Sequence, residues 1–327
     1  MNKLYKFIIG FIISFAGLWY AFQGVDLQQI KIHLVRTDIT YLILSMVVMV
    51  SSVMVRAMRW KLILIPLHTF KLKPLYKSTM IGYFGNGVLP FRLGELLRAY
   101  AISRSNSISS SAAFGTILLE RLLDLIGLAV LMAIVAFLSP LMEWSGNILF
   151  GLIIFTVCGF IFVFWLGKSH SKFHEIVVHW KLFEKKSGQT VLRIINNILK
   201  GLTSIRKTKH TGGLIFYTIT LWFMYFVCTY LIVLATQIDI SWIGACIILI
   251  ATTLAISIPS APGYVGTYHA AAVYVLVNIL HAGVAESQAF SVLIHAIGYI
   301  PLVIIGFVYF LQSSIHFKEI KSVKVPS

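Results

Sequence analysis

Long apolar runs separated by short polar segments dominate the chain. A bilayer core about 30 Å thick needs about 20 mostly apolar residues in a helix that crosses it, so each run of that length predicts a membrane span. The runs that qualify cover residues 4–22, 39–55, 111–138, 148–167, 212–236 and 287–312. The pattern therefore predicts an all-α, polytopic membrane protein with about six full spans, forming a single membrane domain over residues 1–327.

Two further apolar segments, residues 78–110 and 242–280, are interrupted by glycine and proline and are too short to cross the bilayer comfortably. A chain that enters as a helix, breaks and returns as a second helix forms a re-entrant hairpin, and one such hairpin is predicted in each segment. The residues expected at the breaks are Gly87, Pro90 and Gly94 in the first segment and Pro259, Pro262, Gly263 and Gly266 in the second.

Lysine and arginine are concentrated in particular segments between the apolar runs, and cytoplasmic loops are the ones that carry such an excess. Residues 56–77 form one such predicted loop, which holds Arg56 and Arg59 among its basic residues and contains no acid. Residues 168–210 hold ten basic and two acidic residues. Together with the lysines near both ends of the chain, this bias predicts both termini in the cytoplasm and a location in the cell inner membrane.

The same bias places outside the cell a loop at residues 23–38, whose charges cancel, and the acidic loop that follows residue 138. The first hairpin then has to enter and leave by the cytoplasmic face, whereas the second has to enter and leave by the outer face. The two hairpins are therefore predicted to point at each other from opposite sides of the membrane.

Both breaks contain the pattern Pro-x-x-x-Gly, and each break follows two spans and precedes one. Residues 1–140 and 148–312 are therefore predicted to be the two halves of an inverted-topology repeat. Interrupted helices at corresponding positions of inverted halves are typical of transporters that bind substrate near the bilayer midplane. Since non-helical backbone at that depth must be satisfied by protein or by water, the breaks are expected to line a cavity.

Composition supports this interpretation and excludes several others. Apolar residues make up 58% and charged residues 12% of the 327 residues, which is too apolar for a soluble fold. The formal net charge of +16 is explained by membrane topology, so nucleic-acid binding is not expected. Cys158, Cys228 and Cys246 show no metal-ligand or redox spacing, and there is no P-loop or nucleophile elbow, so neither a metal site nor a cofactor is expected.

The first apolar run follows a short basic region, which is also how a secretory signal begins. No small-residue cleavage site follows it, so the run is interpreted as a retained span.

The basic segment 168–210 contains apolar residues at helical spacing, first at residues 173–180 and again at residues 191–205. Two amphipathic helices are predicted there. They either lie on the anionic inner leaflet or pack on the protein itself, and the sequence favours neither alternative.

Three charged residues, Arg92, Glu95 and Arg98, lie at or just after the first break. Their three-residue spacing puts Glu95 on the same helical face as both arginines. The planar fork of arginine suits a phosphate or a carboxylate. Two arginines against one acid leave a positive charge uncompensated, which favours an anionic headgroup site, while the alternative is an arginine–glutamate pair that only pins the hairpin.

Glu120, Arg121 and Asp124 lie ten or more residues into the following span, which at a rise of about 1.5 Å per residue is about 15 Å deep. Ionisable groups at that depth are costly, so they are usually paired and functional. One acid is predicted to hold Arg121, and the other to meet Arg92 or Arg98 across the hairpin. A purely structural ion-pair network and a carboxylate that carries a proton are both open alternatives.

His269 follows the second break, and His295 lies in the last predicted span. A lone histidine in an apolar helix is commonly a hydrogen-bonded core residue. The alternative for His269 is a role as a proton relay.

The motifs GNGVLPFRLGELLRAYAISR, TILLERLLDLIGL and SIPSAPGYVGTYHAA occur in this order along the chain. In these motifs, and over nearly its whole length, the chain resembles the lysylphosphatidylglycerol synthase transmembrane family, whose members are also called flippase-like or UPF0104 proteins. The positions that match the signature of that family are Asn86, Pro90, Arg92, Gly94, Glu95, Arg98, Glu120, Arg121, Asp124, Pro259, Pro262, Gly263 and Gly266.

The resemblance implies a membrane domain that moves a lipid or lipid-linked headgroup between leaflets, with Asn86 and the charged signature residues as candidate substrate contacts. Family members that make aminoacylated lipids carry a further soluble transferase domain after the membrane part, and the sequence ends without one, so lipid aminoacylation is not expected of it. Tyr268 and His269 stand where a glutamate is common in the family, which argues against an acid-dependent role for the second hairpin.

Three functions follow from these observations. The preferred one is a lipid translocase that binds a membrane lipid with an anionic or phosphate-containing headgroup between the hairpins and is oriented by the anionic inner leaflet. The second is a membrane lipid-modifying transferase, which would need a nucleotide-binding or tRNA-binding surface that the sequence does not show outside residues 168–210. The third is an accessory subunit of a separately encoded lipid-modifying enzyme.

Overall fold

The computed structural model of the protein describes residues 3–89, 92–104, 108–139, 186–258, 260–313 and 315, together with short pieces between residues 150 and 161. All the regular secondary structure in these residues is helical, as the apolar pattern predicts. The α-helices are α1 (Lys3–Phe22), α2 (Leu27–Arg36), α3 (Ile39–Leu64), α4 (Leu72–Val88), α5 (Gly94–Arg104), α6 (Ser110–Leu138), α9 (Lys186–Leu202), α10 (Thr211–Thr236), α11 (Trp242–Ser257), α12 (Thr267–Tyr274) and α13 (Val284–Leu311).

Within the described residues, α3, α6, α10 and α13 are each long and apolar enough to cross a membrane. Helix α1 meets α2 at a bend of 81°, and this pair is a candidate for a fifth crossing. These helices match the predicted spans at residues 4–22, 39–55, 111–138, 212–236 and 287–312. The span predicted at residues 148–167 lies mostly outside the described residues, so the count of six spans stays a prediction.

The prediction of a loop at residues 23–38 is wrong, because most of this segment forms the helix α2. Asp26 caps its N-terminus by accepting hydrogen bonds from the backbone amides of Gln28 and Gln29. Asp38 caps α3 in the same way through the amide of Thr40. The two acids that were counted only as loop charges therefore satisfy the amides that the start of a helix leaves without partners.

The predicted end of the second span at residue 55 is also wrong, because α3 continues to Leu64. Arg56 and Arg59, which were assigned to a cytoplasmic loop, lie inside this helix and are 5% and 0% exposed. The apolar positions Trp60, Ile63 and Leu64 continue the buried face of the helix beyond them. A basic residue marks the end of a span only where it reaches water, and these two arginines are paired inside the protein instead.

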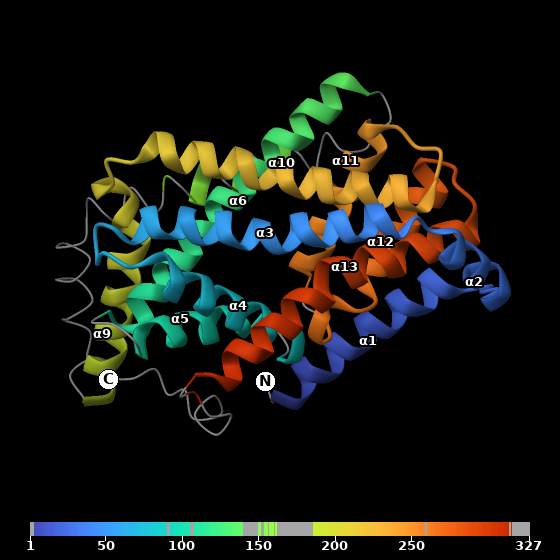
Figure 1. The fold of residues 1–327 in the computed structure, drawn as a ribbon. Helices are drawn as coiled ribbons and strands as arrows, with labels where there is room; N and C mark the ends of the chain where they lie inside the picture. The colour runs from blue at the N-terminus through green and yellow to red at the C-terminus, as the bar shows by residue number, and fades with distance from the viewer. Residues whose placement is uncertain are drawn as a thin grey trace.

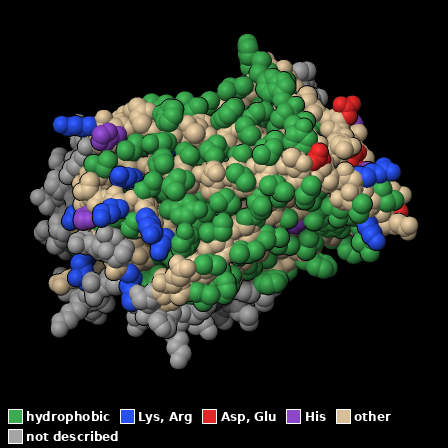
Figure 2. Space-filling view, viewed as in Figure 1, with side chains coloured by type: hydrophobic (Ala, Val, Ile, Leu, Met, Phe, Trp, Pro, Cys, Tyr) green, Lys and Arg blue, Asp and Glu red, His purple; other side chains and the backbone are tan. Residues whose placement is uncertain are grey.

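Helices α3 and α10 lie side by side along most of their length (Figure 1). The hydroxyl of Ser45 donates a hydrogen bond of 3.1 Å to the backbone carbonyl of Cys228 across this pair. The apolar core continues on both sides, with one cluster around Trp60 and Ile117 and another around Ile248 and Phe290. Figure 2 shows a broad apolar belt over the surface, with basic side chains gathered at the end of the bundle where α9 lies.

The two segments predicted as hairpins both form two helices joined by a break. Helices α4 and α5 pack against each other, as do α11 and α12, and the pairs lie toward opposite ends of the bundle (Figure 1). The short helix η4 (Pro262–Tyr264), within the second break, contacts α4. The two breaks therefore meet inside the protein, while the inverted repeat and its orientation in the membrane stay predictions.

Glycines allow the first hairpin to pack closely. A Cβ atom on Gly94 would overlap the carbonyl oxygen of Gly82 and the amide nitrogen of Asn86, both of which are backbone atoms of α4. Gly85 faces the Cα of Gly94 in the same contact. The predicted break residue Gly94 is thus the first residue of α5, where it lets the two helix backbones touch.

Helix α9 packs along α6, and its leucines Leu192, Leu199 and Leu202 are buried. Of the two alternatives for the predicted amphipathic helices, the structure supports packing on the protein for this one. The helix predicted over residues 173–180 lies outside the described residues. The 3₁₀-helix η3 (Thr203–Lys207) follows α9, and the π-helix η5 (Val275–Ile279) follows α12.

Replacing Gly94 with alanine is expected to destabilise the protein by about 1 to 3 kcal/mol, because the added methyl group meets backbone that can move only by separating the helices. Thermal unfolding of the detergent-solubilised protein measures the change. Gly212→Ala in α10 is the matched control, since a Cβ there meets nothing within 4 Å. An equal effect of the two substitutions would contradict the close packing of α4 on α5.

Candidate functional site

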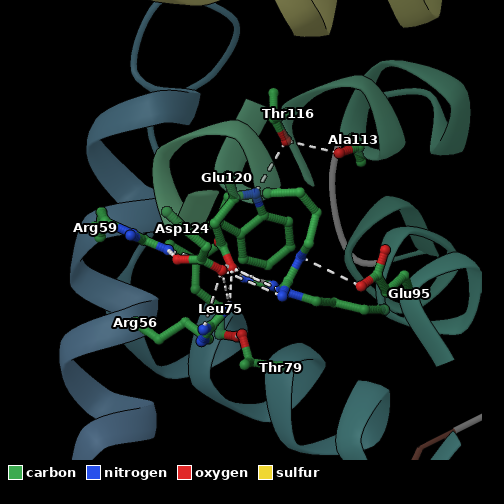
Figure 3. Close-up of polar contacts among 12 residues, drawn as sticks. Arg56, Arg59, Leu75, Thr79, Glu95, Ala113, Thr116, Glu120 and Asp124 are labelled. Atoms are coloured by element: carbon green, nitrogen blue, oxygen red, sulfur yellow. Dashed lines mark hydrogen bonds and ion pairs between the residues drawn. The ribbon is translucent and has the colours of Figure 1, made fainter. Parts of the chain in front are cut away.

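A cluster of charged side chains from three helices lies inside the bundle (Figure 3). Its centre is the carboxylate of Glu120 in α6, which is completely buried. Arg98 of α5 binds both carboxylate oxygens, with Nη1 to Oε1 and Nη2 to Oε2 each at 3.0 Å. The guanidinium of Arg98 also lies 3.9 Å from the centroid of the Trp60 ring. This bidentate pair confirms the predicted contact between an acid of the third span and an arginine of the first hairpin.

Arg56 and Arg59 of α3 complete the cluster from the opposite side. Arg56 Nη1 lies 2.6 Å from Glu120 Oε1, and Arg59 Nη2 lies 2.5 Å from Asp124 Oδ1. Arg56 also donates a hydrogen bond of 2.9 Å to the hydroxyl of Tyr225 in α10.

The sequence does indicate that Arg56 and Arg59 are buried, although counting the basic residues of the segment suggests a cytoplasmic loop. They are three residues apart within a helical apolar pattern that continues to Leu64, and they complement two acids four residues apart in α6.

Arg121 lies at the edge of the cluster, between two acids. Its Nε is 3.2 Å from Glu95 Oε1, and its Nη1 is 3.2 Å from Asp124 Oδ2. The prediction that one acid holds Arg121 is therefore confirmed. Glu95 was placed on a common face with Arg92 and Arg98, but its described ion pair reaches across to α6 instead.

The cluster brings together four arginines and three carboxylates, so it retains one positive charge. Asp124 and Arg121 are the more accessible members, with side chains 18% and 28% exposed. Breaking a buried ion pair leaves the remaining charge without a partner, which costs about 3 to 5 kcal/mol. The network thus ties the first hairpin to α3 and α6.

The two helix breaks line a separate, partly open cavity of about 100 Å³. This confirms the expectation that the breaks line a cavity. Its described lining comes from both hairpins and consists of Asn86, Leu89, Arg92, Ser257, Ile258, Ser260, Ala261 and Tyr264.

Arg92 and Tyr264 face each other across this cavity. The guanidinium carbon of Arg92 lies 5.8 Å from the centroid of the Tyr264 ring. Both residues have left-handed backbone, with φ of 57° and 59°, which is uncommon for residues other than glycine. Such conformations persist where the surrounding structure imposes them and are frequent at functional sites. Arg92 is therefore a break residue that contacts the opposite hairpin, and it does not join the cluster around Glu120.

Helix α13 holds the backbone of both breaks. The hydroxyl of Tyr299 donates a hydrogen bond of 2.7 Å to the carbonyl of Gly87 in the first hairpin. One turn earlier, Nε2 of His295 lies 2.8 Å from the carbonyl of Gly263 in the second break. Helix α1 contributes a third contact, in which Ser14 Oγ accepts a hydrogen bond of 2.8 Å from the amide of Ala261.

The remaining predicted site residues are distributed around the second break. Gly263 and Gly266 have φ of 73° and 100°, so both use backbone that favours glycine. The ring of His269 is buried, with its centroid 4.7 Å from that of His295. Its role as a relay stays a prediction. Pro262 begins η4, whereas Pro90 and Pro259 lie outside the described residues.

Comparison with known proteins assigns this arrangement to a family. The family described as "Lysylphosphatidylglycerol synthase TM region" matches residues 7–306. The chain belongs to this family. The match covers both hairpins, the buried cluster and the cavity, so these features lie within the family's membrane region.

Three relatives of the chain are described as UPF0104 membrane proteins. UPF0104 membrane protein MJ1078 of Methanocaldococcus jannaschii is 28% identical over 231 residues, which cover 69% of this chain and 93% of the relative. MJ1595 of the same organism is 30% identical over 125 residues, covering 37% of each chain. PH1989 of Pyrococcus horikoshii is 30% identical over 145 residues, covering 43% of this chain and 42% of the relative.

Glu120→Gln is expected to destabilise the protein by about 3 to 5 kcal/mol, because the buried arginines around it lose their common counter-charge. Unfolding of the protein in detergent micelles gives the difference. Glu286→Gln in the first turn of α13 is the control, and a change of at most about 1 kcal/mol is expected there. Unchanged stability of the Glu120 variant would show that the cluster does not hold the first hairpin.

Tyr299→Phe is expected to cost about 0.5 to 1.5 kcal/mol, because it removes one neutral hydrogen bond to the Gly87 carbonyl. The same unfolding measurement applies, with Tyr41→Phe at a partly exposed position of α3 as the control. A loss as large as that of Glu120→Gln would mean that the neutral contacts of α13 hold the breaks as firmly as the ion pairs do.

Proposed function

We propose that this protein is a flippase-like translocase that carries the headgroup of an anionic lipid between the two leaflets. The observation that supports it most directly is the meeting of two helix breaks at one cavity, which holds an arginine, within an apolar helical bundle. Interrupted helices that face each other in this way are typical of transporter substrate sites. In this proposal the two hairpins are oppositely oriented in the cell inner membrane, and both termini are cytoplasmic.

The size of the cavity favours a headgroup over a whole lipid. Sites that enclose a drug-sized molecule measure about 300 to 1,000 Å³, whereas this cavity measures about 100 Å³. Around it, the apolar side chains of Val88, Leu93 and Ile258 are 47%, 38% and 47% exposed. The hydrocarbon tails would therefore stay in the bilayer while the protein shields only the polar head.

The chemistry of the cavity favours translocation over lipid modification. Its described lining offers hydroxyl groups, an amide and one guanidinium, and no carboxylate or imidazole that could act as a general base. The family relation is compatible with a lipid-related membrane role of either kind.

We expect proteoliposomes that contain the protein to move a fluorescent anionic phospholipid between leaflets faster than protein-free vesicles, and faster than a zwitterionic analogue. Arg92→Ala should abolish most of this gain, because it removes the cation that faces the cavity. Arg104→Ala, at an exposed arginine of the same hairpin, is the control for a change in net charge.

Each variant is first checked for a single size-exclusion peak and an unchanged unfolding temperature. Acceleration of neither lipid by the wild-type protein would refute the translocase. The remaining functions would then be lipid modification or support of a separately encoded enzyme.

A further inference from the structure

The charged residues at the first hairpin divide into two groups with different access to a ligand. In the buried cluster the two carboxylates that face the most deeply buried arginines, those of Glu120 and Asp124, are already occupied. Both oxygens of Glu120 bind arginine, as do both oxygens of Asp124. The arginines that face them are each paired with a carboxylate, and Arg59 is completely buried. A ligand could bind there only by displacing ion pairs that hold three helices together.

Arg92 is in a different situation. Within the described part of the chain no carboxylate lies at ion-pair distance from it, and its contact across the cavity is the neutral side chain of Tyr264. Its Nε atom is buried without a hydrogen-bond partner, and so is Oδ1 of Asn86 in the same cavity. Arg92 is partly exposed and keeps its contact with Tyr264, but the buried N–H of its Nε lacks an acceptor. A buried donor without a partner is costly unless a ligand or water satisfies it.

The neutral groups of the cavity are suited to an anion whose oxygen atoms point toward both walls at once. Asn86 and Arg92 belong to the first hairpin, whereas Ser260 and Tyr264 belong to the second, so donors reach the cavity from two walls. A carboxylate has two oxygens in one plane, which a single arginine fork can bind. A tetrahedral phosphate also presents oxygens to the opposite wall.

We infer that this cavity binds one phosphate group carried by a lipid, with Arg92 as the anion-binding residue and Asn86, Ser260 and Tyr264 as its neutral partners. The single cation selects a group with one negative charge, as in a phosphodiester, over a diphosphate. The inference rests on the proposed function and deepens it by assigning the ligand class and the residue that recognises it. The cluster around Glu120 then positions the hairpin and does not contact the ligand.

The test is ligand binding by the full-length protein in micelles of an uncharged detergent, followed as a concentration-dependent rise in unfolding temperature. The probes are dihexanoyl phosphatidylglycerol, dihexanoyl phosphatidylcholine, inorganic phosphate and hexanoate. The phosphatidylglycerol should stabilise the wild-type protein most, inorganic phosphate more weakly, and hexanoate least. Phosphatidylcholine carries the same phosphodiester, so it should also bind. Its affinity should be lower than that of phosphatidylglycerol, because its ammonium group would approach Arg92.

Arg92→Gln should weaken phosphatidylglycerol binding by at least about tenfold, since it removes a charge-assisted contact. Arg92→Lys should retain part of the affinity, because it keeps the charge and loses the planar fork. Arg104→Gln should bind as the wild type does. All three substitutions keep a long side chain, and the unfolding temperature without ligand reports whether each variant is folded.

Four results would overturn the inference. They are wild-type affinity in Arg92→Gln, equal binding of hexanoate and phosphatidylglycerol, equal binding of inorganic phosphate and phosphatidylglycerol, and no response to any probe. The third would assign the site to free phosphate.

The outcome is separable from that of the translocation assay. Binding that depends on Arg92, without lipid movement by the wild type, would keep this site and refute the translocase. Lipid movement that persists in Arg92→Gln would keep the translocase and refute the assignment of the phosphate site to Arg92.

Discussion

The buried carboxylate of Glu120 is the interaction on which the rest of the structure depends. A charge without a partner at this depth in the bundle would be too costly, so the position of Glu120 requires arginines beside it. Arg98 supplies one from α5 and Arg56 another from α3, so three helices are brought to one point. The close contact of Gly94 with the backbone of α4 then fixes the position of the first residue of α5. Together these contacts place Arg92 at the cavity and not among the ion pairs.

The two hairpins are held by different kinds of interaction, and this gives the cavity two unequal walls. The first hairpin is joined to α6 by ion pairs, whereas the second break is held by neutral hydrogen bonds from His295 and Ser14. Buried ion pairs lose several kcal/mol when one partner is removed, and neutral hydrogen bonds contribute about 1 kcal/mol each. Moving the second break should therefore cost less free energy than moving the first, so a change in the shape of the cavity is expected to come from the second break.

Much of this arrangement could be predicted from the sequence, because a bilayer imposes strong constraints on apolar length and on backbone hydrogen bonding. The long helices, the two interrupted segments and the pairing of Arg98 with an acid of α6 all followed from them. Arg56 and Arg59 were missed because a charge count treats every basic residue as exposed to water. Their partners are more than 60 residues away in the chain, and only the tertiary packing of α3 against α6 shows that they are buried. Helix α2 was missed because Asp26, which caps its N-terminus, was counted only as a loop charge.

The satisfaction of polar groups at the breaks also explains why a cavity remains there. Where a helix is interrupted inside an apolar bundle, its free carbonyls must find donors. Tyr299 and His295 of α13 bind the carbonyls of Gly87 and Gly263, so these two carbonyls are satisfied without the side chain of Arg92. Within the described residues the guanidinium of Arg92 makes no ion pair, unlike that of Arg98. A charge without a carboxylate partner among the described residues, kept beside a cavity in a left-handed backbone conformation, is the part of this structure that a ligand would explain.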